Sequence, residues 1–105
     1  MDEAAELEVL PPEAIVKLLS EENLALLHLI ATKRPGSVRE LSELARRKES
    51  NLSRTLKKLQ GAGIVRLEKG PGRTCAPRLA ARRVTLDLDL AGGARVVSVK
   101  RSATR

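Results

Sequence analysis

Residues 50–60 carry side chains whose types and spacing suit the reading of duplex DNA. Arg can donate two hydrogen bonds to the edge of guanine and Asn can pair in the same way with adenine, so Arg54 and Asn51 are candidates for base contacts, together with Lys58. Ser50 and Lys57 flank this group and suit phosphate contacts, which fix register without specifying sequence. The candidate DNA-binding residues of this segment are Ser50, Asn51, Ser53, Arg54, Lys57 and Lys58. A solvated basic face has the same composition, so the neighbouring elements must decide.

A helix over residues 50–60 would present these side chains on one face. Leu52, Leu56 and Leu59 recur at i, i+4 and i+7. At 100° per residue the three leucines fall within about 60° of one another, which leaves the polar side chains roughly opposite. Ser50 is the predicted N-cap of this helix, and the Gly-Ala-Gly sequence at 61–63 is its predicted stop.

The residues just before this helix predict its partner in a helix-turn-helix pair. Ser37 followed by Glu40 forms a capping box, so a helix of about two turns begins there. Residues 46–48, Arg-Arg-Lys, form the predicted connection to the helix over 50–60.

Two further helices are predicted upstream, over 12–19 and over 20–33, the second capped by Ser20. Residues 24–30 are apolar nearly all round, which predicts burial on several sides, in a bundle or in a dimer seam. His28 lies in this run, where we expect a packed or interface histidine rather than a catalytic base.

After residue 63 the apolar period changes from 3.6 to 2. Residues 64–69 and 84–90 are predicted to be the strands of a hairpin, with 70–83 as the loop between them. Four arginines lie in that loop: Arg73, Arg78, Arg82 and Arg83. Arg73 and Arg78 are the further candidate DNA-binding residues, because a basic wing can reach the minor groove or flanking phosphates. A flexible charged loop without such contacts is the alternative.

The predicted fold is therefore α+β, a winged helix-turn-helix with three to four helices followed by a β-hairpin wing. An acidic N-terminal lead-in spans 1–11, and the winged helix DNA-binding domain spans 12–90. Residues 91–105 are predicted to be a C-terminal strand, over 95–100, or a flexible basic tail.

Charge is distributed unevenly along the 105 residues, whose net charge is +7. Residues 1–30 carry seven acids and one base, and residues 31–105 carry nineteen bases and six acids. Such a basic block favours a polyanionic partner, here double-stranded DNA. The chain contains no Phe, Tyr or Trp, which excludes base–aromatic stacking. A core without aromatic residues also favours completion by a second subunit, hence a homodimer.

The chain contains too few histidines and cysteines for the usual catalytic and metal-binding sites. One histidine, His28, and one cysteine, Cys75, cannot build a multi-ligand metal site or an internal disulfide, so we expect no enzyme, no metal and no cofactor. No apolar run approaches the roughly 18 residues that span a bilayer, so no membrane partner is expected. The acidic first residues are unlike a signal peptide, so we expect a cytoplasmic protein.

Two segments, ELSELA over 40–45 and NLSRTLKKLQGAGIV over 51–65, resemble the helix-turn-helix core of MarR- and ArsR-like winged-helix regulators. With PEAIVKLLS over 12–20 and RRVTLDLDL over 82–90, the chain is also similar to small prokaryotic DNA-binding proteins, several of which are encoded beside toxins as antitoxin-like regulators. Those families have Gly and an apolar residue where this chain has Arg46 and Arg47. Because a non-Gly residue in a left-handed turn costs about 1 kcal/mol, a longer first helix or a different turn is expected.

The sequence thus predicts a sequence-specific double-stranded DNA-binding transcriptional regulator. The homodimer would read the major groove with residues 50–60 and flanking DNA with the wing over 70–83. One alternative is an antitoxin-like protein-interaction module that binds and neutralises a partner toxin, with or without autoregulation. Another is double-stranded RNA binding, which depends on shape recognition across minor grooves.

Overall fold

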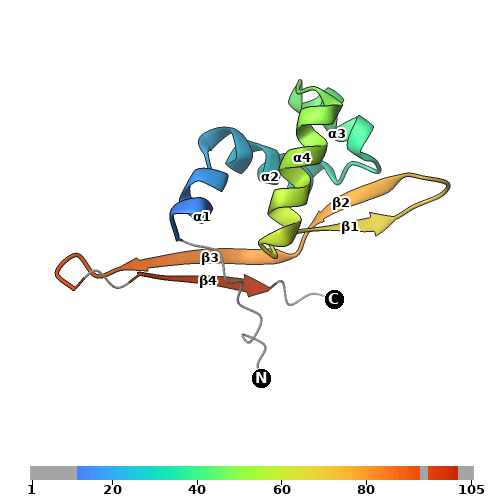
Figure 1. Ribbon diagram of the computed structural model, residues 1–105. Coiled ribbons are helices and arrows are strands. Elements are labelled where there is room, and N and C mark those ends of the chain that lie inside the picture. Colours follow the sequence, from blue (N-terminus) through green and yellow to red (C-terminus); the bar gives the residue numbers. More distant parts are fainter. Residues whose placement is uncertain (1–11, 93–94, 102–105) are drawn as a thin grey trace.

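A computed structural model of the chain describes residues 12–92 and 95–101, in which four helices precede four strands (Figure 1). The helices are α1 (Pro12–Leu18), α2 (Glu21–Lys33), α3 (Val38–Ala45) and α4 (Glu49–Gly61). The strands are β1 (Val65–Lys69), β2 (Cys75–Leu79), β3 (Ala81–Leu88) and β4 (Arg95–Arg101). This order confirms the predicted α+β class and the winged helix-turn-helix arrangement. The lead-in over 1–11 and the tail over 102–105 lie outside the described residues.

Two of the predicted helix starts are formed by the expected caps. The Ser20 side chain accepts a hydrogen bond from the Asn23 backbone N–H at 3.2 Å and begins α2. Ser37 does the same for the Glu40 N–H at 3.0 Å and begins α3. The Glu40 carboxylate accepts in return from the N–H of Gly36 at 2.9 Å, so the capping box closes one residue before the cap.

The predicted N-cap of α4 is wrong. The helix begins at Glu49, and the cap position belongs to Lys48, whose side chain makes no capping hydrogen bond. The Leu52 N–H already bonds to the Lys48 carbonyl at 2.9 Å, so Ser50 lies inside the first turn. The left-handed backbone at Arg46 ends α3 in a tight turn. Helix α4 therefore begins at Glu49, before the position that a Ser50 cap would give it.

The expectation of a longer α3 or a different turn is also wrong, because Arg46 itself adopts the left-handed conformation. Its φ and ψ are 58° and 43°, and its N–H bonds to the carbonyl of Ser42. The Arg47 N–H bonds to the same carbonyl at 3.1 Å. Arg46 therefore adopts a left-handed conformation that is strained for arginine and unstrained for glycine, and the turn between α3 and α4 stays short.

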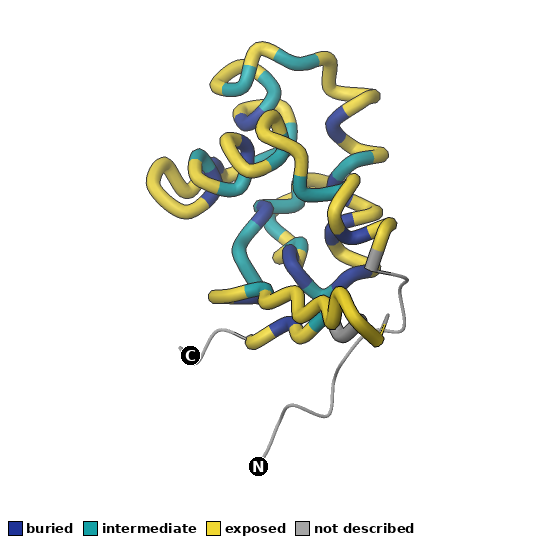
Figure 2. The backbone as a smooth tube through the Cα atoms, turned by 90° about the vertical axis from the view of Figure 1, so that its left-hand side faces the viewer, coloured by how far each residue is buried: buried dark blue, intermediate teal, exposed yellow. Residues whose placement is uncertain are grey.

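The core is aliphatic and lies where the helices meet each other and the strands. It contains Ile15, Leu26, Ile30, Leu41, Leu52, Leu56, Leu59, Ala62, Ile64, Val65, Ala81 and Val99. In α2 only Leu26 and Ile30 are fully buried, whereas Leu24 is 51% exposed and His28 is exposed. Burial of α2 on several sides within the chain, with a packed histidine, is therefore wrong, because α2 has a covered side and an open side (Figure 2). Burial in a dimer seam, with an interface histidine, stays a prediction.

The strand predicted over 64–69 is confirmed as β1, but it forms the wing hairpin with β2 and not with the strand predicted over 84–90. Strands β1 and β2 pair antiparallel from Val65 opposite Leu79 to Lys69 opposite Cys75. The predicted loop over 70–83 is therefore wrong beyond residue 74, since residues 75–79 form β2 and β3 begins at Ala81, which places Arg82 and Arg83 in a strand. Only residues 70–74 form the wing turn. Pro77 obscured this strand in the sequence. Proline is tolerated at a sheet edge, and here it is fully buried in a strand that contacts α2.

A second, longer hairpin pairs β3 with β4, from Ala81 opposite Arg101 to Leu88 opposite Arg95. The strand predicted over 95–100 is confirmed as β4. The strand predicted over 84–90 is confirmed as β3, which begins three residues earlier and ends two residues earlier. Near its base the hairpin contacts α1 through β4, and Val99 is buried there. Toward its tip it leaves the helices and becomes exposed (Figures 1 and 2).

Candidate nucleic-acid interface

Helix α4 separates its apolar residues from its polar residues as the sequence predicts. Leu52, Leu56 and Leu59 are at most 1% exposed and face the core. The six candidate residues of the segment are all exposed: Ser50, Asn51, Ser53, Arg54, Lys57 and Lys58. The helix therefore offers donors along its outer surface while its inner surface fixes it to the domain.

Arg47 holds α4 against α2 through a contact that the sequence analysis missed. Its Nη1 donates to Oδ1 of Asn23 on α2 at 3.0 Å, and its Nη2 donates to Oγ1 of Thr55 on α4 at 3.2 Å. The Asn23 amide in turn donates to the carbonyl of Leu18 at 2.7 Å. No sequence spacing points to this arrangement, because it joins residues 24 and 8 positions apart that only the tertiary fold brings together.

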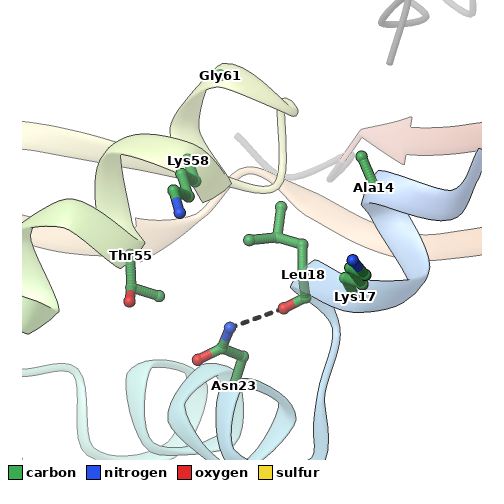
Figure 3. A pocket seen from close by; sticks show the side chains of 7 residues that line it. All are labelled: Ala14, Lys17, Leu18, Asn23, Thr55, Lys58 and Gly61. Atoms are coloured by element: carbon green, nitrogen blue, oxygen red, sulfur yellow. Dashed lines mark hydrogen bonds between the residues drawn. The ribbon is translucent and has the colours of Figure 1, made fainter. Parts of the chain in front are cut away.

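Lys58 faces a shallow hollow between α4 and α1 (Figure 3). The hollow is lined by Ala14, Lys17, Leu18, Asn23, Thr55, Lys58 and Gly61. Lys57 precedes Lys58 by one residue, so the two lysines are 100° apart around the helix. Of the candidate residues on α4, Lys58 is thus the one that lies toward α1.

The tip of the wing is a tight turn over residues 70–74. The Gly70 N–H bonds to the Thr74 carbonyl at 2.9 Å, and the Thr74 hydroxyl donates to the Pro71 carbonyl at 2.7 Å. Gly72 has a φ of 63°, a conformation that favours glycine. Arg73 follows it and is exposed, so the structure places this candidate at the end of the hairpin.

Arg78 lies in β2 rather than in a loop, and its side chain is only 14% exposed. Its Nη1 donates to the carbonyls of Pro35 and Pro77, both at 2.8 Å. Its Nε has no hydrogen-bond partner and lies 4.0 Å from Oε1 of Glu68. Arg78 therefore ties the wing to the α2–α3 connection and is the least accessible of the eight candidates.

Glu68 lies on β1 near the wing turn, beside the arginines Arg66 and Arg78. Arg66 contacts its Oε2 through Nη2 at 2.8 Å and through Nε at 3.2 Å, and also donates to the Leu79 carbonyl at 3.0 Å. These hydrogen bonds from Arg66 lower the pKa of the Glu68 carboxyl below its ordinary value of 4.5, and the charges of Arg66 and Arg78 act in the same direction. Arg66 and Arg78 lie opposite each other on the β1–β2 ladder, and the Glu68 carboxylate near both of them offsets their repulsion.

Other chemistry has little support in residues 12–92 and 95–101. No group of three or more His, Cys, Asp or Glu side chains lies together there as a metal site would require. Cys75 is a free, half-buried thiol at the start of β2. None of the helices in these ranges has the length and hydropathy needed to cross a membrane.

A family model described as HVO_A0114 matches residues 18–86, more than half of the chain. The chain belongs to the HVO_A0114 family. The matched segment runs from the end of α1 to within β3, so it contains the helix-turn-helix pair and the β1–β2 wing of this chain. Searches of curated proteins and of solved structures found no match.

Proposed function

We propose that the protein is a sequence-specific double-stranded DNA-binding transcriptional regulator. Its helix α4 enters the major groove and its β1–β2 wing contacts the flanking DNA. One observation carries the proposal: α4 buries three leucines and exposes Asn51 and Arg54 on the other side, within a helix-turn-helix pair. These two side chains are suited to adenine and guanine edges, respectively.

The electrostatics of the chain support this function. Residues 31–105 carry a net charge of +13 and include α3, α4 and the wing. Lysines and arginines that neutralise phosphates release counterions, so the affinity should fall steeply with salt. Ser50, Ser53 and Lys57 would supply phosphate contacts on α4, and Arg73 would supply one from the wing tip.

Exposed apolar side chains on α1 and α2 support a homodimer. Val16 is 54% exposed and Leu24 is 51% exposed. A second copy would cover them and would place two α4 helices on the half-sites of a symmetric operator. The resemblance to MarR- and ArsR-like regulators agrees with this reading, and such a regulator acts in the cytoplasm beside the chromosome.

Selection of bound fragments from the organism's own genomic DNA tests the proposal. We expect recovery of a short site with twofold symmetry, and competition by duplex DNA but not by duplex RNA of the same sequence. Recovery of no enriched fragment, or equal competition by the RNA, would contradict the proposal. Capture of a toxin by a protein that binds no DNA would favour the protein-interaction alternative.

A further inference from the structure

The hollow between α1 and α4 joins two lysines from different elements. Its volume is about 580 Å³, and it opens to the surface. Lys17 lies on the α1 wall and Lys58 on the α4 wall, with Leu18 between them (Figure 3). The two cations therefore border one space, although they are 41 positions apart in the sequence.

Neither ammonium group forms an ion pair within the described part of the chain. None of the residues that line the hollow is an acid. Lys17 and Lys58 make no ion pair or side-chain hydrogen bond with any of the residues described. Two like charges that face one space without an acid create a site for an anion.

The floor of the hollow is held in place by hydrogen bonds. Asn23 and Thr55 both accept from Arg47, and Asn23 donates to the Leu18 carbonyl. These contacts fix α1, α2 and α4 relative to one another, so the separation of the two walls is set before any ligand arrives. An anion that binds here does not have to order the backbone.

We propose that this hollow binds a backbone phosphate of the duplex that α4 reads, with Lys17 and Lys58 as its two cationic contacts. The inference rests on the proposed function. Helix α4 stands between α1 and the wing (Figure 1), so DNA lying along α4 passes the hollow on one side and the wing on the other. Lys58 then contacts a phosphate rather than a base, and Lys17 joins the interface from a helix outside the helix-turn-helix pair.

Salt dependence of binding separates phosphate contacts from base contacts. We expect Lys17→Ala to reduce the slope of log affinity against log salt by about 0.9, and to weaken binding about fivefold at 0.15 M salt, equally for every duplex. Lys58→Ala should behave in the same way and should leave the base preference unchanged. Lys100→Ala is the matched control, because Lys100 is exposed on β4, next to the inward-facing Val99.

A pair of variants at Gly61 tests the charge of the site independently. A Cβ at Gly61 meets no atom within 4 Å, so a side chain fits there. Gly61→Glu places a carboxylate at the hollow, and Gly61→Gln places a neutral side chain of the same size. We expect Gly61→Glu to bind DNA several-fold more weakly than Gly61→Gln and with a shallower salt slope. Equal affinity of the two variants would overturn the inference.

The remaining outcomes distinguish this inference from the proposed function. If Arg54→Ala changes the base preference while Lys17→Ala leaves the salt slope unchanged, the phosphate site is wrong and the function stands. If the protein binds no duplex, both are wrong. Titration of the DNA-free protein with inorganic phosphate provides the last arm. Saturable binding that Lys17→Ala abolishes, without any change in the DNA salt slope, would assign the hollow to a free anion and overturn the DNA contact.

Discussion

The guanidinium of Arg47 lies 3.2 Å from the Thr55 hydroxyl, to which its Nη2 donates a hydrogen bond. Arg47 belongs to the α3–α4 connection and Thr55 to the middle of α4. Its Nη1 reaches Asn23 on α2 at 3.0 Å, so one side chain links the turn to both helices. The rotation of α4 about its own axis, and hence the direction in which Asn51 and Arg54 project, depends on this contact as well as on the leucines.

Thr55→Val should destabilise the protein by about 1–3 kcal/mol, because it leaves a half-buried guanidinium donor without its acceptor. A double-mutant cycle with Arg47→Ala, measured by urea unfolding, should give a coupling of about 0.5–3 kcal/mol. Thr32→Val is the matched control, since the exposed Thr32 hydroxyl bonds only to a carbonyl of its own helix. Additive effects at positions 47 and 55 would show that the contact does not stabilise the fold.

Arg46→Gly should stabilise the protein, by about 0.5–1 kcal/mol. Arg46 has a φ of 58°, which glycine adopts without the steric cost that a Cβ imposes. Arg39→Gly is the control, because residue 39 lies within α3, where glycine is destabilising by a similar amount. Thermal and urea unfolding would measure both, and a loss of stability in Arg46→Gly would contradict the turn geometry.

Titration of Glu68 should report its arginine neighbours. Its folded pKa is lowered, so its contribution to stability is present above the unfolded value near 4.5 and is lost as the pH falls through the folded pKa. NMR of the side-chain carboxyl should therefore give a midpoint below 4.5. Arg66→Ala should return that midpoint most of the way, because Arg66 is the main cause. A midpoint at or above 4.5 in the natural protein would show that the Arg66 contact is absent in solution.

Self-association should depend on the open sides of α1 and α2. Sedimentation equilibrium is expected to give a dimer for the natural protein and a monomer for the double variant Val16→Lys, Leu24→Lys. Both side chains are about half exposed in the single chain, so the lysines should leave the fold intact. Leu44→Lys controls for added charge at an exposed leucine on α3. A dimer that survives the double change would place the interface elsewhere.

Local signals in the sequence predicted the helical part of the fold well. Ser20 and Ser37 cap the expected helices, and the leucine spacing of α4 fixed its buried side. Each of these features depends on residues within one or two turns of the chain. The cap of α4 was missed because the left-handed Arg46 shortens the turn, and a sequence does not show which residue will accept that strain.

Features that depend on contacts between residues far apart in the chain could not be predicted from the sequence. Pro77 reads as part of a loop, yet in β2 it is buried where that strand contacts α2. The sequence predicts that Arg78 contacts DNA from the wing, yet its side chain donates to the carbonyl of Pro35, 43 positions away. Lys17 lies in an acidic segment and was not predicted to bind DNA, and only the fold brings it to the hollow beside Lys58. The exposed residues of α4 were found because a single helix defines them.

The most direct test of the account is the base preference of Arg54→Ala on the site recovered from genomic DNA. Affinity would be measured for every single-base change in that site, for the natural protein and for the variant. We expect the variant to lose about 1–3 kcal/mol on the best site and to lose discrimination at one base position, while the preferences at the other positions remain. An unchanged pattern of preferences and an unchanged affinity would show that α4 does not read DNA.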